Sequence, residues 1–82
     1  MIRTELVKGL IRSIVLKILT EHKRMYGYEL TQKIEELSKG NIKLTFGSLY
    51  PILHRLEDDG LVKTEAELVN NRNRIYYNLQ YS

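Results

Sequence analysis

The sequence contains no cysteine and only one proline. Without cysteine the chain can form no disulfide, no zinc–thiolate site and no thiol nucleophile, a composition that fits a reducing compartment. No stretch is long and apolar enough for a membrane span or a secretory signal, because the most apolar one, residues 6–19, is interrupted by basic side chains. We therefore expect a soluble, unprocessed cytoplasmic protein.

The patterns that enzymes use are also missing. The histidines His22 and His54 are far apart, and no glycine-rich phosphate-binding motif is present. His54 and Asp58 are one helical turn apart, a spacing that suits an exposed ion pair better than a metal or acid–base site. We therefore expect no catalysis, no cofactor and no metal.

Length and charge set wide limits on the remaining functions. A chain of 82 residues has material for one core, so residues 1–82 are expected to form a single domain. The 13 Lys+Arg against 10 Asp+Glu give a net charge of +3, which permits DNA or an acidic partner without indicating either. A domain this small needs added stabilisation, and self-association is the first candidate.

Apolar spacing predicts two helices in the first half of the chain. Over residues 4–21 the apolar positions cover roughly 220° of a helix surface, about twice the stripe needed to face one core. Part of this helix is therefore expected to meet a second surface. After a break at residues 22–25, a second helix carries Leu30, Ile34 and Leu37.

A third helix is expected to begin at Thr45, whose hydroxyl can cap the free backbone N–H groups of the first turn. Pro51 lies inside this helix, where proline costs about 3 kcal/mol, but the core positions keep their register across it and Gly60 supplies a stop. A local kink with a free Gly47 carbonyl is expected. The core positions are Phe46, Leu49, Leu53 and Leu56.

After Gly60 the apolar period changes from helical to alternating, which predicts two strands over residues 62–68 and 75–79. A loop from Val69 to Asn73 joins them into a hairpin with a basic, asparagine-rich tip. The fold class is therefore mainly α with a β-hairpin. Three helices followed by a two-stranded wing form a winged helix-turn-helix, in which the second helix of the turn enters the DNA major groove.

Three segments resemble, in order, the signatures of the PadR family of bacterial transcriptional regulators: Tyr26–Leu30, Gly47–Val62 and Arg74–Leu79. The resemblance covers nearly the whole chain. It implies a DNA-binding winged helix-turn-helix with a dimerisation helix after the wing. It also implies a repressor, since many members repress genes for detoxification or drug efflux.

The chain departs from this family pattern in its last residues. Ile75 and Gln80 occupy positions where the family usually has lysine and threonine, respectively. The given chain also stops without the usual C-terminal helix. Pairing is therefore expected through the excess apolar face of the first helix. Ligand pockets in this family form largely with the missing helix, so a small-molecule effector is disfavoured. The dimerisation candidates are Leu6, Leu10 and Ile14.

The residues around the start of the third helix are suited to a phosphate. Thr45 and Ser48 are short hydroxyl residues on either side of Gly47, and a helix N-terminus favours an anion. Lys43 and Tyr50 can add phosphate contacts. Two plainer interpretations stay open: Thr45 serves only as the N-cap, and Tyr50 packs in the core with its hydroxyl at the surface.

The wing and the flanking segments supply further candidates. Arg72 and Arg74 are two residues apart, so on a strand both would point toward a DNA backbone or minor groove. The alternative is an ordinary solvated loop. Of Tyr26 and Tyr28, one is expected in the core and the other at the surface. The candidate DNA-contacting residues are Tyr28, Lys43, Thr45, Gly47, Ser48, Tyr50, His54, Arg55, Lys63, Arg72 and Arg74.

The sequence thus predicts a sequence-specific DNA-binding regulator, a repressor that binds double-stranded DNA as a homodimer. The alternative is a winged-helix module that binds protein, with its small positive charge incidental. The acidic run Glu57–Asp59 at the end of the third helix is expected either to repel DNA from that side or to meet a basic neighbour.

Overall fold

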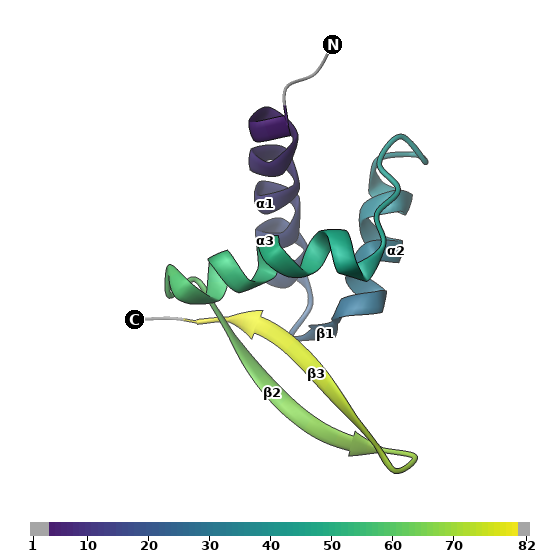
Figure 1. The fold of residues 1–82 in the computed structure, drawn as a ribbon, viewed down its shortest axis with the longest axis vertical. Helices are drawn as coiled ribbons and strands as arrows, with labels where there is room; N and C mark the ends of the chain where they lie inside the picture. Colours follow the sequence, from purple (N-terminus) through teal and green to yellow (C-terminus); the bar gives the residue numbers. More distant parts are fainter. Residues whose placement is uncertain (1–3, 81–82) are drawn as a thin grey trace.

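The computed structural model describes residues 4–80, which form three helices and a three-stranded antiparallel sheet. In Figure 1, α1 and α2 rise from one side of α3 and the β2–β3 hairpin extends from the other. This is the predicted order of a winged helix-turn-helix. The elements are α1 (Thr4–Glu21), β1 (Met25–Tyr26), α2 (Gly27–Leu37), α3 (Phe46–Asp58), β2 (Val62–Val69) and β3 (Arg72–Leu79).

The short strand β1 is the element that the sequence did not predict. It pairs with β3 through Met25 opposite Tyr77 and Tyr26 opposite Tyr76, so that the sheet order is β1-β3-β2. A strand of 2 residues is too short to show an alternating pattern. Its pairing fixes the start of α2 against the base of the wing.

The wing is longer and its turn tighter than predicted. β2 and β3 pair along their whole length, out to Val69 opposite Arg72. Asn70 and Asn71 form the turn with φ of 50° and 63°. These left-handed angles suit a type I′ hairpin turn, and asparagine tolerates them better than most residues. The predicted loop from Val69 to Asn73 was therefore too long, because the polar strand ends gave no alternating apolar signal.

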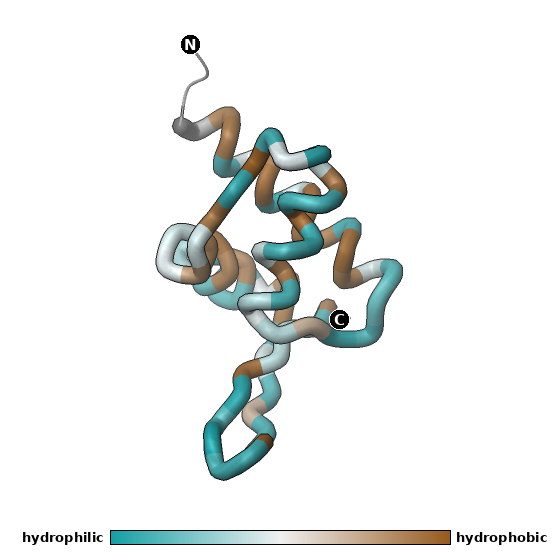
Figure 2. Tube along the Cα trace, turned by 90° about the vertical axis from the view of Figure 1, so that its right-hand side faces the viewer, coloured by the Kyte–Doolittle hydropathy of each residue, from teal (hydrophilic) through white to brown (hydrophobic). Residues whose placement is uncertain are grey.

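A single apolar core joins the three helices to the base of the wing. Burial raises the pKa of the Tyr77 hydroxyl in this core, and the nearby Tyr50 and Glu57 add to the effect. Figure 2 shows apolar segments concentrated in the helical body and a mostly hydrophilic wing. No helix within residues 4–80 combines the length and apolar character needed to cross a bilayer. The core consists of Ile11, Val15, Ile18, Leu19, Leu30, Ile34, Leu49, Leu53, Leu56, Val62 and Tyr77.

The ends of α3 follow the sequence prediction. The Thr45 hydroxyl accepts a hydrogen bond from the Ser48 N–H at 3.1 Å, as an N-cap does. α3 continues through Pro51 as one helix. At its end Gly60 has a φ of +76°, and the Leu61 N–H reaches back to the carbonyl of the last buried leucine of α3 at 2.9 Å. This is the Schellman arrangement that terminates helices.

Two expectations about apolar positions were wrong. Phe46, assigned to the core, is 41% exposed, because its ring contacts Gly27 at the start of α2 and is only partly covered there. Leu37, counted with the apolar stripe of α2, is 51% exposed because it is the last residue of that helix. The apolar surplus of α1 was predicted correctly, since Leu6 and Leu10 are exposed.

We predict that Leu53→Ala lowers the free energy of unfolding by about 2–5 kcal/mol, because Leu53 is fully buried and its truncation leaves a cavity. The matched control is Leu68→Ala on the wing, where the side chain is 68% exposed and a change within about 0.5 kcal/mol is expected. Urea denaturation followed by circular dichroism measures both. Equal losses for the two variants would contradict the assignment of the core.

Candidate nucleic-acid interface

The amino-terminal end of α3 is open to solvent. Thr45, Gly47 and Ser48 are all exposed, and so is Lys43 just before them. The Thr45 hydroxyl also donates to the Ser48 hydroxyl at 3.1 Å, so the N-cap and its neighbour form one small polar surface. Thr45 is thus an N-cap whose surroundings leave the helix end accessible to an anion.

An aromatic row runs along one side of α3. Phe46 and Tyr50 meet edge to face with their ring centroids 5.8 Å apart, and Tyr50 stacks on His54 at 6.0 Å. Tyr50 is 48% exposed, so it lies at the surface rather than in the core. The spacing of one helical turn between these residues is the sequence signal from which the row could have been predicted. The row gives α3 a rigid, partly apolar outer surface.

The carboxyl-terminal half of α3 is held in ion pairs. His54 Nε2 lies 3.6 Å from Asp58, and Arg55 Nε lies 3.6 Å from Asp59. Asp59 also accepts a hydrogen bond from Arg12 of α1 at 2.7 Å. Of the two interpretations of the acidic run, the basic neighbour is therefore the one found. These contacts balance much of the charge at this end of the helix.

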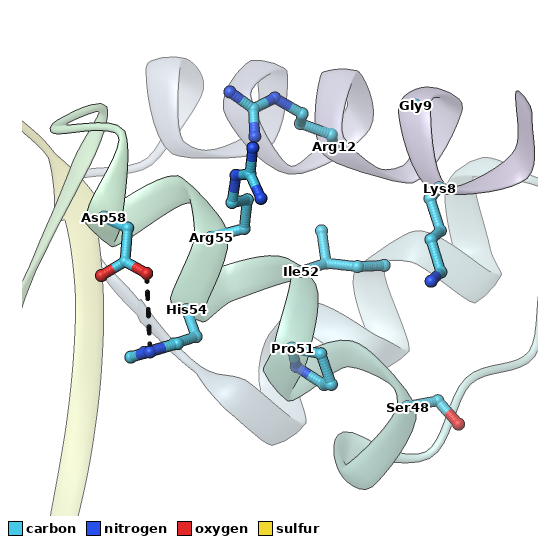
Figure 3. A pocket seen from close by; sticks show the side chains of 9 residues that line it. All are labelled: Lys8, Gly9, Arg12, Ser48, Pro51, Ile52, His54, Arg55 and Asp58. Carbon is cyan, nitrogen blue, oxygen red and sulfur yellow. Dashed lines mark ion pairs between the residues drawn. The ribbon is translucent and has the colours of Figure 1, made fainter. Parts of the chain in front are cut away.

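An open groove of about 760 Å³ lies between the first half of α1 and the outer side of α3. Figure 3 shows Lys8 and Arg12 of α1 on one wall, with Ser48 and Arg55 of α3 on the other. Lys8 and Arg12 are not among the candidate site residues predicted from the sequence. Their position beside α3 depends on the crossing of two helices far apart in the chain, which the helical period alone does not give.

The wing carries its two arginines on one face, as predicted from their spacing. Arg72 is exposed beside the turn, whereas the Arg74 guanidinium carbon lies 4.2 Å from the centroid of the Tyr26 ring. Lys63 shares this face by register but lies at the base of the wing, next to the end of α1. In Figure 1 the tip of the wing and the amino-terminal end of α3 lie toward the same side of the molecule.

Of the two tyrosines near the start of α2, Tyr28 is at the surface as expected, but Tyr26 is not in the core. Tyr26 is half-buried and meets Tyr76 edge to face at 5.8 Å. Tyr28 is 60% exposed, and its hydroxyl accepts a hydrogen bond from Gln32 at 2.9 Å. Tyr28 is therefore the tyrosine whose hydroxyl is accessible to a ligand. In the described part of the chain, no three His, Asp or Glu side chains are arranged to hold a metal ion.

Comparisons with known proteins agree with this geometry. The model of the family described as "Transcriptional regulator PadR-like family" matches residues 15–81. An uncharacterized protein from Lysinibacillus sphaericus is 28% identical over 80 residues, which cover 96% of this chain and 72% of that protein. The transcriptional regulator Rv3488 from Mycobacterium tuberculosis is 45% identical over 53 residues, which cover 65% of this chain and 47% of that protein.

Solved structures show the same fold. A transcriptional regulator from Clostridium thermocellum has a TM-score of 0.80 at 26% identity, and the match covers 98% of this chain and 75% of that one. A PadR-like transcriptional regulator from Bacillus cereus has a TM-score of 0.74 at 26% identity, covering 94% of this chain and 73% of that one. The winged-helix architecture is thus shared with regulators of transcription.

We predict that Thr45→Ala lowers the free energy of unfolding by about 1 kcal/mol, because the Ser48 N–H loses its side-chain acceptor at the start of α3. Thr45→Ser keeps the hydroxyl and is the matched control, expected to stay close to the original protein. Thermal and urea denaturation of both variants measure the difference. An unchanged stability in Thr45→Ala would mean that the cap contributes nothing.

Proposed function

This chain belongs to the PadR-like family of transcriptional regulators, and from that premise we propose that it is a sequence-specific repressor that binds double-stranded DNA as a homodimer in the cytoplasm. The family and the structural neighbours are regulators of transcription, not enzymes. The observation that carries the finer proposal is the open amino-terminal end of α3, with its hydroxyl groups and the adjacent aromatic row.

In the proposed complex α3 enters the major groove with its amino-terminal end leading. The backbone N–H groups around Gly47, the hydroxyls of Thr45 and Ser48, and the Lys43 ammonium approach phosphates. Tyr50 and His54 face the groove wall from the aromatic row. This arrangement is supported by the exposure of each of these side chains. Arg55 can contact DNA only if its ion pair with Asp59 breaks.

The wing and α2 would contact the backbone on either side of the groove. Arg72 is exposed at the wing tip and is our candidate for a phosphate contact, and the accessible Tyr28 hydroxyl is another. We leave Arg74 and Lys63 out of the proposed contacts. The Arg74 guanidinium covers the Tyr26 ring, and Lys63 lies at the base of the wing.

The proposed dimer uses the exposed apolar side of α1. Leu6 is 67% and Leu10 is 53% exposed, and they border an apolar groove with Ile42 and Leu44 from the loop before α3. Ile14 packs partly against the core, so it would contribute less area. Two protomers would place two copies of α3 on half-sites about 34–36 Å apart, one turn of DNA.

We predict that the protein shifts a DNA fragment from upstream of its own gene in the presence of excess competitor DNA. Fluorescence anisotropy with the same fragment gives the dissociation constant. If excess competitor DNA abolishes the shift, the binding is non-specific and the proposed sequence specificity is wrong. No binding at low salt would instead favour the protein-interaction module.

Arg72→Ala is expected to weaken binding to all DNA sequences and to reduce the slope of log K against log salt by about 0.9, since one phosphate contact releases its counterion. Lys23→Ala removes the same charge from the loop between α1 and β1, beside Lys63 at the base of the wing, and is the matched control. Titrations over a range of salt concentrations measure both slopes. An unchanged slope in Arg72→Ala would remove Arg72 from the proposed contacts.

Leu10→Asp is expected to convert the dimer to a monomer, because it places a charge within the apolar face of α1. Leu68→Asp changes an exposed leucine on the wing and should leave the dimer intact. Sedimentation equilibrium separates the two states. A monomeric original protein at high micromolar concentration would contradict the proposed dimer.

A further inference from the structure

One face of the wing is joined to the helical body by a cluster of charged and aromatic side chains. By register, this face is opposite to the one on which Thr64 hydrogen-bonds Glu57 of α3 and Tyr77 enters the core. We call it the wing-base cluster. Its members are Arg24 before β1, Tyr26 of β1, Glu65 and Glu67 of β2, and Arg74 and Tyr76 of β3.

Arg24 is the centre of the wing-base cluster. Its Nη1 lies 2.5 Å from a carboxylate oxygen of Glu67 and 3.5 Å from one of Glu65. Its guanidinium carbon lies 4.0 Å from the centroid of the Tyr76 ring. The hydrogen bond with Glu67 raises the pKa of Arg24 above its ordinary value. One side chain from the α1–β1 segment therefore touches both strands of the wing.

Arg74 makes the reciprocal contact from the wing to the body. Its guanidinium covers Tyr26, and the Tyr26 ring meets the edge of Tyr76. Two aromatic rings in contact thus lie between the guanidinium groups of Arg74 and Arg24. On the Arg24 side, Asn78 donates to the second carboxylate oxygen of Glu65 at 3.0 Å and helps to orient that carboxylate.

The cluster supports the wing beyond the reach of β1. The β1–β3 pairing ends where Tyr26 lies opposite Tyr76. On this face the next pair toward the tip is Glu67 with Arg74, and both members of that pair contact the body through the cluster. The direction in which the outer wing extends therefore depends on these two contacts in addition to the strand pairing.

We propose that Arg24 is a positioning residue for DNA binding, which holds the wing so that Arg72 reaches the phosphate backbone beside α3. This inference rests on the proposed function, and it assigns Arg74 to the support of the wing rather than to DNA. Without the cluster, the outer hairpin pivots on the short β1 pairing. Ordering the outer hairpin when DNA binds then has an entropic cost, which lowers the affinity.

The sharpest test uses two substitutions that change the charge in opposite directions. Arg24→Ala removes a positive charge, and Glu67→Gln removes a negative one. Both are expected to weaken operator binding roughly threefold to tenfold, in the range of coupling between contacting residues. Glu35→Gln, an exposed residue of α2 outside the cluster, is the matched control and should leave affinity unchanged or slightly higher.

Two further readouts separate positioning from direct contact and from a general loss of stability. The salt dependence of binding should keep its slope in Arg24→Ala, in contrast to Arg72→Ala. Amide hydrogen exchange in the free protein should become faster over residues 66–75 and stay unchanged in α2 and α3. Arg24→Lys keeps the charge for Glu67 and should recover part of the affinity.

The possible outcomes are distinct. A reduced salt slope in Arg24→Ala would make Arg24 a phosphate contact and overturn the proposal, as would unchanged affinity in Glu67→Gln. If Arg24→Ala fails to fold, Glu67→Gln carries the test. If the original protein binds no DNA, the proposed function fails, and the exchange data still decide whether the cluster holds the wing: unchanged exchange over residues 66–75 would overturn it.

Discussion

The burial of Leu49, Leu53 and Leu56 determines the rest of this structure. These three leucines lie on one side of α3 and are completely removed from solvent against α1, α2 and the base of the sheet. Because a helix has only one side to offer the core, the opposite side and the capped end at Thr45 are left accessible. The surface that we propose for DNA binding is in this sense a result of how the core is filled.

The elements defined by local pattern could be predicted from the sequence. The helical period, the hydroxyl at Thr45 and the stop at Gly60 are properties of neighbouring residues, and each reappears in the structure. β1 and the position of Phe46 could not be predicted in the same way. Both depend on what lies opposite across the fold: Tyr76 and Tyr77 for β1, and Gly27 for Phe46.

In the candidate site, too, features set by neighbouring residues could be predicted from the sequence, and features set by contacts across the fold could not. Exposure at the start of α3 follows from the position of the cap and could be predicted from the sequence, while the role of this surface in DNA binding stays a prediction. The different environments of Arg72 and Arg74 depend on the Tyr26 ring, which is more than forty residues away in sequence. The neutralisation of the acidic end of α3 by Arg12 is equally remote. A net charge of +3 therefore understates how unevenly charge is distributed over the surface.

The contact of Phe46 with Gly27 has a consequence for how this chain can diverge. Any side chain added at Gly27 would overlap the aromatic ring, and no backbone adjustment of α2 alone would relieve it without separating α2 from α3. The side chains at positions 27 and 46 therefore limit each other's size. A larger residue at one is compatible with the present angle between α2 and α3 only when the other shrinks or turns outward.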